Sequence, residues 1–223
     1  MAQALARYDE FAEWYERWIG DAPPLIAAQA GLLPAVAGAR VLDLACGQGR
    51  MSRYLARLGA DVLGVDVSAA MLGKARAAGP AGITYLCADV TRAPTWWDGR
   101  PFDGCTCELA LMDIDDLAGA LATVAAVLRP GGWFVASVMH PCFPGNGRGQ
   151  SSWPPGGGYE REGWWTSPGH NPEGVRIRVG ATHRKLSTIL NALHDAGLEA
   201  ERFAEPPAPV PVPTYLLWRC RRR

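Results

Sequence analysis

The segment RVLDLACGQG, residues 40–49, limits the folds open to this chain more than any other feature. An apolar run of strand length ends in a turn that contains Gly47 and Gly49, and a helical pattern follows as far as Leu58. Glycine lets a ligand approach the backbone closely, and the free N–H groups at the start of the helix then face that ligand. The segment therefore predicts a strand, a ligand-binding turn and a helix. Many α/β proteins share this unit, so the turn alone does not identify the ligand.

Strands and helices continue to alternate along the chain. Further strands are expected at residues 61–66, 83–87, 102–109 and 133–138, and the helices between them at residues 68–78 and 117–128. Ser68 is suited to cap the first of these helices, because its hydroxyl can accept a bond from a free N–H of the first turn. Alternation of this kind predicts a parallel sheet with helices on both faces. Two final strands, at residues 198–203 and 215–220, have only a loop between them, which favours an antiparallel pair at one edge.

Two segments stand outside this alternation. The first residues form an amphipathic helix that ends near Gly20, with an apolar face made by Tyr8, Phe11, Tyr15, Trp18 and Ile19. After the fifth strand, residues 141–174 are rich in glycine, proline and tryptophan, which predicts an irregular insertion that covers the site. An ordered surface flap with no role in binding is the alternative. A short strand is expected at residues 175–179, before a helix that ends at Gly197.

Charge and cysteine usage exclude several classes of protein. Lys plus Arg and Asp plus Glu both number 22, so the balanced charge argues against a nucleic-acid partner. No run is apolar and long enough to cross a membrane, and the charged N-terminal residues do not resemble a signal peptide. The six cysteines lack the paired spacing of a zinc site, which favours free thiols and a cytoplasmic location. For Asp113, Asp115 and Asp116 we expect helix capping rather than a magnesium site, so no metal is predicted.

Three acidic residues follow successive strands and indicate what the turn binds. Asp43, Asp66 and Asp89 are placed at the carboxyl ends of their strands, where ligands of open α/β sheets bind. Asp66 is suited to accept both hydroxyls of a ribose, and Asp89 to accept from an adenine amino group. The alternative is that each acid only caps a turn. A dinucleotide site expects a third glycine where Ser52 stands, and Asp43 would repel a pyrophosphate. The positively charged S-adenosylmethionine suits these acids better.

The motifs VLDLACGQG, LGVDVSAAML, CADV, FDGCTCELALMDI and LRPGGWFVASV together resemble class I S-adenosylmethionine-dependent methyltransferases of the small-molecule type, over about residues 40–140. The resemblance implies a loop for the methionine part of the cofactor, made by Asp43, Ala45, Gly47 and Gly49. It implies ribose and adenine contacts from Asp66, Val67, Met71, Asp89 and Val90. Cys107 and Glu108 are implied to lie beside the methyl group. Ala45 stands where the family usually has glycine, and we expect a slightly tighter loop with binding intact.

The resemblance also implies the fold and its parts. We expect a Rossmann-like three-layer sandwich with a mostly parallel seven-stranded sheet, an antiparallel edge strand, an N-terminal helix and an insertion after the fifth strand. Within a single domain, 1–223, four parts are expected: an N-terminal helical cap (1–39), a cofactor-binding core (40–140), a substrate-covering insertion (141–183) and a C-terminal helix with strands (184–223). By the same resemblance Tyr8 and Tyr15 contact the methionine end or the substrate, although simple core packing is an equal alternative.

Methyl transfer needs alignment of the acceptor and, for a hydroxyl or a protonated amine, a base. The candidate catalytic residues are His140, His183 and Glu108. His140 is placed at the end of the fifth strand, and Glu108 can instead hold an amine. His194 lies inside a helix and is expected to be structural. Candidate substrate contacts are Tyr8, His140, Trp153, Trp164, Trp165 and His170.

The function predicted from the sequence is methyl transfer from S-adenosylmethionine to O, N or C of a small aromatic or apolar metabolite, with S-adenosylhomocysteine as the product. The expected partners are a small-molecule substrate, no nucleic acid and no membrane, and the expected state is a monomer or homodimer. Two alternatives are kept: an NAD(P)-dependent oxidoreductase, and a non-catalytic module that binds S-adenosylmethionine.

Overall fold

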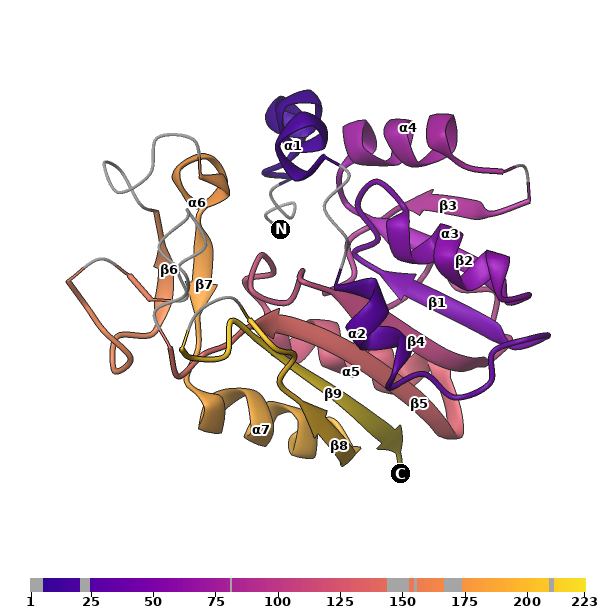
Figure 1. The fold of residues 1–223 in the computed structure, drawn as a ribbon. Helices are drawn as coiled ribbons and strands as arrows, with labels where there is room; N and C mark the ends of the chain where they lie inside the picture. Colours follow the sequence, from indigo (N-terminus) through magenta and orange to yellow (C-terminus); the bar gives the residue numbers. More distant parts are fainter. Residues whose placement is uncertain are drawn as a thin grey trace.

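The computed structural model describes residues 6–20, 25–80, 82–143, 153–154, 156–166, 174–208 and 211–223. Its main sheet has seven strands, in the spatial order β3-β2-β1-β4-β5-β9-β8 (Figure 1). Their bounds are β1 (Arg40–Leu44), β2 (Asp61–Asp66), β3 (Thr84–Cys87), β4 (Phe102–Glu108), β5 (Leu128–Met139), β8 (Leu198–Ala204) and β9 (Tyr215–Arg222).

The strand directions follow from the connections between the strands. β1 to β5 pair in parallel, because a helix or a long segment returns the chain to the same edge before each new strand. β9 pairs antiparallel with both β5 and β8. A loop joins β8 to β9. The predicted mostly parallel sheet with an antiparallel pair at one edge is therefore confirmed.

Helices cover both faces of this sheet. Their bounds are η1 (Asp9–Phe11), α1 (Ala12–Ile19), α2 (Ile26–Ala30), α3 (Arg50–Arg57), α4 (Ala69–Ala78), α5 (Leu117–Val127), α6 (Val175–Arg178) and α7 (Leu186–Asp195). Side chains of α5 and α7 share one core cluster with Leu42 and Leu44 of β1. Side chains of α2 and α3 share the other cluster with Val41. Alternate residues of β1 thus face opposite layers, as in a strand buried on both faces.

The predicted N-terminal helix is present as the 3₁₀ turn η1 followed by α1. Gly20 ends it at a φ of +50°, a conformation that glycine adopts without steric cost. Asp9 then fixes the segment to the start of α4, because its carboxylate accepts a 2.6 Å bond from the Ser68 hydroxyl. Ser68 also caps α4 by accepting from the Met71 N–H, as its sequence predicts.

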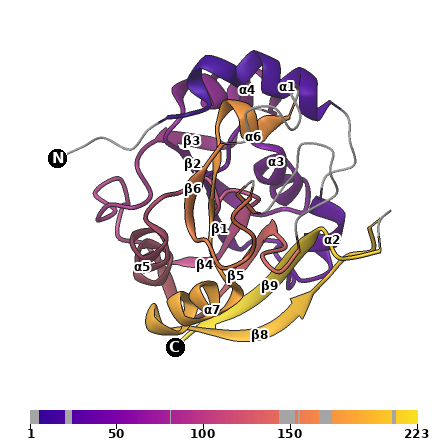
Figure 2. The ribbon, with the colours of Figure 1, turned by 90° about the vertical axis from the view of Figure 1, so that its left-hand side faces the viewer.

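The insertion after β5 contains a second, two-stranded antiparallel sheet of β6 (Gly163–Trp165) and β7 (Ala181–His183). Figure 2, which turns the left-hand side of Figure 1 toward the viewer, shows this small sheet in front of the ends of the main strands. The prediction of a strand at residues 175–179 is wrong, because Val175–Arg178 forms the short helix α6. Burial of Arg176 against a loop of the core outweighs the alternating VRIRV pattern.

All six cysteines are free thiols. Within the described part of the chain, no helix has both the length and the apolar character needed to span a bilayer.

Candidate functional site

A cavity of about 440 Å³ lies at the carboxyl ends of β1, β2 and β4. This volume falls within the range of small-molecule sites in proteins. Seven of the predicted cofactor residues line it: Tyr15, Asp43, Ala45, Gly47, Asp66, Val67 and Met71. Glu108, a predicted catalytic residue, lines it as well. The structure therefore brings the turn after β1, the end of β2 and the end of β4 around one space.

The turn after β1 has the backbone conformation that its glycines predict. Ala45, Gly47 and Gly49 have φ values of +53°, +53° and +74°, all in the left-handed region. A Cβ on Gly47 would come within 3.4 Å of the Met71 side chain and narrow the gap between the turn and α4. A Cβ on Gly49 would collide with the Tyr85 hydroxyl and meet Ala75 at 3.0 Å. Glycine at 47 is thus favoured by the left-handed backbone, whereas glycine at 49 also lets Ala75 of α4 and Tyr85 of β3 pack closely against the turn.

Asp66 joins the two loops that border the cavity. One carboxylate oxygen accepts a 2.8 Å bond from the Gly47 N–H, and the other accepts a 2.8 Å bond from the Ser68 N–H. Burial raises the pKa of Asp66, and these N–H groups oppose the shift. Each oxygen keeps a further lone pair, so the carboxylate can still accept from ligand hydroxyls.

Asp43 lines the cavity and is also held in place by two hydroxyl groups. Its carboxylate accepts from the hydroxyls of Ser52 on α3, at 2.6 Å, and Thr106 on β4, at 2.9 Å. Only 1% of Asp43 is exposed, and burial raises its pKa to about 6 despite the two hydroxyls. Ser52 therefore occupies the position of a dinucleotide glycine for a structural reason: its hydroxyl holds the acid of β1.

Glu108 ends β4 at the centre of the cavity wall. Burial, together with the nearby charge of Asp43, raises the pKa of Glu108 to about 7, although Arg50 acts in the opposite direction. A carboxyl group with such a pKa can exchange a proton near neutral pH.

Four predicted cofactor residues do not line this cavity. Gly49 packs beneath the turn, and Cys107 and Val90 belong to the core cluster below α5. Asp89 follows β3, but its carboxylate closes a local turn by accepting from both the N–H and the hydroxyl of Thr91. The adenine contact of Asp89 and Val90 stays a prediction.

The other half of the cavity is formed by residues far apart in sequence. The N-terminal segment supplies Tyr8, Tyr15 and Trp18, and the rings of Tyr8 and Tyr15 meet edge to face at 5.1 Å. Apolar walls come from Ile19, Leu25, Met112, Ile114, Met139 and Val175. Arg176 of α6 also lines this half. Tyr8 and Tyr15, which the sequence singled out, line this cavity, and their contact with the cofactor or substrate stays a prediction. Sequence reasoning missed Arg176, since the expected strand hid which arginine turns inward.

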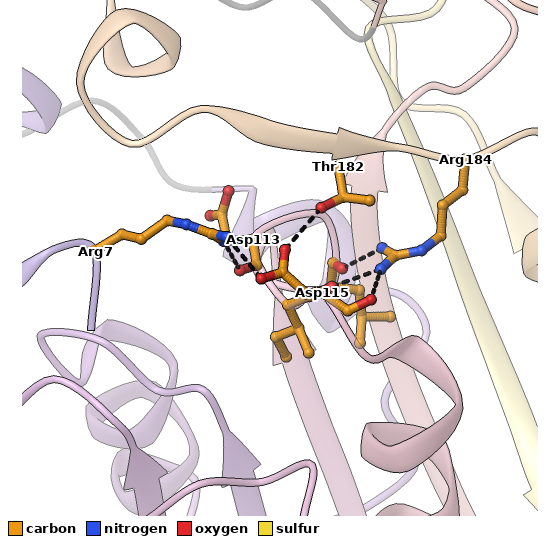
Figure 3. A network of polar contacts seen from close by, with 7 residues as sticks. Arg7, Asp113, Asp115, Thr182 and Arg184 are labelled. Carbon is orange, nitrogen blue, oxygen red and sulfur yellow. Dashed lines mark hydrogen bonds and ion pairs between the residues drawn. The ribbon is translucent and has the colours of Figure 1, made fainter. Parts of the chain in front are cut away.

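A polar network next to the cavity joins side chains from three segments of the chain (Figure 3). Arg7 donates to the Asp113 carbonyl at 3.0 Å and to the Asp115 carboxylate at 2.7 Å. Thr182 on β7 donates to the other oxygen of Asp115, and Arg184 donates to its carbonyl. The network thus ties the N-terminal segment, the loop after β4 and the insertion together.

The acidic residues of this loop have the roles of braces and caps. Asp113 accepts from Tyr8 at 2.9 Å and from Arg176 at 2.6 Å. Asp116 caps α5 by accepting from the Gly119 N–H. Among the residues that the structure describes, no cluster of His, Cys, Asp and Glu is arranged to hold a metal ion.

The predicted histidine bases do not reach the cavity. His140 is buried, with Nε2 2.8 Å from a Glu205 oxygen and Nδ1 accepting from the Cys142 N–H. His183 is buried on β7, with Nε2 2.8 Å from the Tyr159 carbonyl. His170 lies outside the described residues. Of the three catalytic candidates, only Glu108 lines this cavity, whereas His183 lines a smaller cavity beside it.

The three tryptophans of the insertion also lie outside the cavity wall. Trp153 donates to the Pro141 carbonyl at 2.7 Å, and Trp165 is buried beneath the small sheet. Trp164 is half exposed, with the Arg7 guanidinium 5.6 Å above its ring. These side chains pack within the insertion and its surroundings, and their predicted contact with a substrate stays a prediction. The tryptophan that does line the cavity is Trp18 of α1.

Comparison with known proteins gives this site a family. A model described as a methyltransferase domain matches residues 42–136. A solved S-adenosylmethionine-dependent methyltransferase from Mesorhizobium loti superposes with a TM-score of 0.72 at 34% identity, covering 91% of this chain and 99% of that one. This chain belongs to the class I S-adenosylmethionine-dependent methyltransferases. The oxidoreductase alternative finds no support.

Two curated methyltransferases are similar over the core. The demethylmenaquinone methyltransferase of Clavibacter sepedonicus is 34% identical over 140 residues, which is 60% of this chain and 56% of that protein. The malonyl-[acyl-carrier protein] O-methyltransferase of Pectobacterium atrosepticum is 38% identical over 136 residues, which is 59% of this chain and 50% of that protein. The matched segments thus span about half the length of these methyltransferases.

Proposed function

We propose that this protein transfers the methyl group of S-adenosylmethionine to a small-molecule acceptor and releases S-adenosylhomocysteine. The observation that carries the proposal is that a single cavity is lined by Asp66, by Glu108 and by apolar and aromatic side chains that include Tyr8 and Trp18. A cofactor at one end and an acceptor at the other then meet beside Glu108. Methyl transfer needs this alignment and the exclusion of water more than it needs covalent help from the protein.

The residues at the cofactor end fit S-adenosylmethionine. Asp66 has lone pairs left for the ribose hydroxyls, while Val67 and Met71 offer an apolar surface beside it. The open turn at Ala45 and Gly47 suits the methionine part, since a side chain at Gly47 would narrow that space. The acids Glu108 and Asp43 suit its positive charge. When bound, the cofactor supplies an electrophilic methyl group on its sulfonium.

The acceptor end supports a small apolar or aromatic molecule. Its walls are largely methionine, isoleucine, tryptophan and tyrosine side chains. The similar proteins are named for acceptors of varied size, demethylmenaquinone and a malonyl group on a carrier protein. We assign the base, where the acceptor must lose a proton, to Glu108, the carboxyl group that ends β4 and lines the cavity.

The function is tested with methyl-labelled S-adenosylmethionine and a fractionated metabolite extract. We expect label to move into one extract component with the wild-type protein. Asp66→Ala should weaken binding of S-adenosylhomocysteine by about 1–3 kcal/mol, because it leaves the ribose hydroxyls unpaired. Glu108→Gln should bind S-adenosylhomocysteine normally yet transfer label about 100-fold more slowly. Tight cofactor binding with no transfer to any fraction would instead support a non-catalytic binding module.

The division into a cap (1–39), a core (40–140), an insertion (141–183) and a C-terminal part (184–223) stays our proposal. The cytoplasmic location, the monomeric or homodimeric state and the absence of nucleic-acid and membrane partners likewise stay predictions.

A further inference from the structure

Arg176 stands out among the residues around the cavity because it is a buried cation. Only 5% of it is exposed, and no other arginine or lysine is buried among the residues that the structure describes. Arginine and lysine are almost never fully buried without complete pairing, since removing the charge from water is costly. We therefore ask which N–H donors of Arg176 have acceptors within the protein and which are left for a ligand in the cavity.

The protein meets only part of those needs. Nη1 donates to Asp113 at 2.6 Å and to the Gly180 carbonyl at 2.9 Å. Nε is buried and has no hydrogen-bond partner. Nη2 makes no hydrogen bond to any described residue. One edge of the guanidinium, formed by Nε and Nη2, is therefore fixed in place with its donors unused.

The negative charge of Asp113 does not prevent a second anion from binding at this edge of the guanidinium. Its two carboxylate oxygens are already divided between Arg176 and the Tyr8 hydroxyl, so part of its charge is taken up by a second donor. The Tyr15 side chain lines the same space.

Two flexible side chains give access to the unused edge. Met112 and Met139, like Arg176, line both the main cavity and a smaller one of about 30 Å³ beside it. Methionine is unbranched and readily repacks around a ligand. A rearrangement of Met112 and Met139 would therefore join the two spaces next to Arg176.

We propose that Arg176 determines acceptor specificity by binding a carboxylate of the acceptor through Nε and Nη2. The inference rests on the proposed function and names the chemical class of its substrate: an apolar molecule that carries one carboxylate. The planar edge of a guanidinium matches a carboxylate with two parallel hydrogen bonds, which an ammonium cannot reproduce. The carboxylate is a handle rather than the methylated atom, because an oxygen that accepts two charge-assisted bonds is a weak nucleophile.

The test uses the full chain saturated with S-adenosylhomocysteine. Benzoate, phenylacetate, indole-3-acetate and octanoate are each titrated by calorimetry, next to their primary amides. We expect at least one acid to bind about tenfold or more tightly than its amide, since the amide is neutral and replaces one acceptor oxygen by a donor. No preference for any acid over its amide would overturn the proposal.

Two variants separate this role from a structural one. Arg176→Lys keeps the charge beside Asp113 and should lose the preference for acids while binding S-adenosylhomocysteine normally. Arg178→Lys, on the same helix but over the rings of Trp14 and Phe11, is the matched control and should keep the preference. An acid preference retained in Arg176→Lys would overturn the proposal. Weaker S-adenosylhomocysteine binding in this variant would also overturn it, by assigning the guanidinium to the cofactor's own carboxylate. Failure of the wild type to bind S-adenosylhomocysteine would instead refute the proposed function.

Discussion

Glu108 and Asp43 show how single residues prepare the site for a cation. Both are carboxyl groups at the ends of neighbouring strands, and burial raises their pKa values to about 7 and about 6. Without a ligand, these carboxyl groups are therefore partly protonated near neutral pH. A positive ligand placed beside them favours the ionised forms and lowers both pKa values.

This coupling predicts proton release when S-adenosylmethionine binds. Between about pH 6 and pH 8 the free protein is partly protonated at these groups, so binding should expel protons and the affinity should rise with pH. Calorimetry in two buffers of different ionisation enthalpy measures the number released. S-adenosylhomocysteine, which lacks the sulfonium charge, should release fewer. Equal proton release for both ligands, or none, would contradict the role of these carboxyl groups.

Ala45 adopts a conformation that favours glycine. Its φ of +53° places the Cβ in the crowded left-handed region, which costs about 1 kcal/mol for a side chain of this kind. Ala45→Gly should therefore raise the free energy of unfolding by up to about 1 kcal/mol, less the added freedom of the unfolded chain. Urea denaturation measures this difference. Ala77→Gly, on the exposed side of α4, is the control and should lower stability. A clear loss of stability in Ala45→Gly would show that the turn is not strained.

The sequence predicts several residues of the site because they stand at the ends of strands, which can be located from apolar runs. The turn residues and Asp66 follow apolar runs, so their placement is set by the run itself. Asp43 differs because it alternates with Leu42 and Leu44, which puts it on the α3 face and under Ser52. Its bracing partners could not be predicted, since Thr106 comes from a strand far along the chain.

At the scale of elements, the cover of the cavity is assembled from segments that are remote in sequence. η1 and α1 rest on α4 through Asp9 and through the ion pair of Glu16 with Lys74. They meet the insertion through Arg178 of α6, whose guanidinium lies 4.5 Å from the Trp14 ring. Asp113 joins both parts to the core. The cap and the insertion are thus expected to behave as one coupled cover.

Removing the charge of Asp113 should loosen this cover. Asp113→Asn keeps the size of the side chain but leaves the buried Arg176 without its anion, at a cost of about 3 kcal/mol in the free energy of unfolding. Hydrogen exchange should become faster in residues 6–19. Asp98→Asn removes an exposed partner of Arg40 and Arg100 and is the control, with an effect below about 1 kcal/mol. Equal effects of the two substitutions, or unchanged exchange in residues 6–19, would show that Asp113 is not the joint.

Elements of the core were predictable, whereas those of the insertion were not. Strands β1 to β4 and the second half of β5 are apolar runs that the sequence pattern predicts. The pattern missed the start of β5 at Leu128, because Pro130 and Gly131 are typical of a turn. Residues 175–178 alternate in polarity like a strand but form a helix, because Arg176 is drawn toward Asp113. Such a long-range ion pair leaves no trace in local sequence. The same holds for β6 and β7, which pair across a segment rich in glycine and proline.

At the scale of the whole molecule, strand order determines where the cavity lies. The order reverses between β1 and β4: β1 is followed outward by β2 and β3 on one side, and β4 by β5 on the other. Connections leave this point toward opposite faces of the sheet and open a crevice at the carboxyl ends of the strands. The 440 Å³ cavity is lined by residues of these strand ends. Figures 1 and 2 show α1, α6 and the small sheet at this end of the main sheet. The strand order that defines the fold therefore also determines where the cavity lies.

A crystal structure of the full chain with S-adenosylhomocysteine tests the assignment of this cavity most directly. We expect the ribose hydroxyls within hydrogen-bond distance of the Asp66 carboxylate, the methionine part over the turn at Gly47, and the sulfur directed toward Glu108. A ligand bound outside the crevice between β1 and β4, with Asp66 contacting only Gly47 and Ser68 as it does now, would contradict the proposed site.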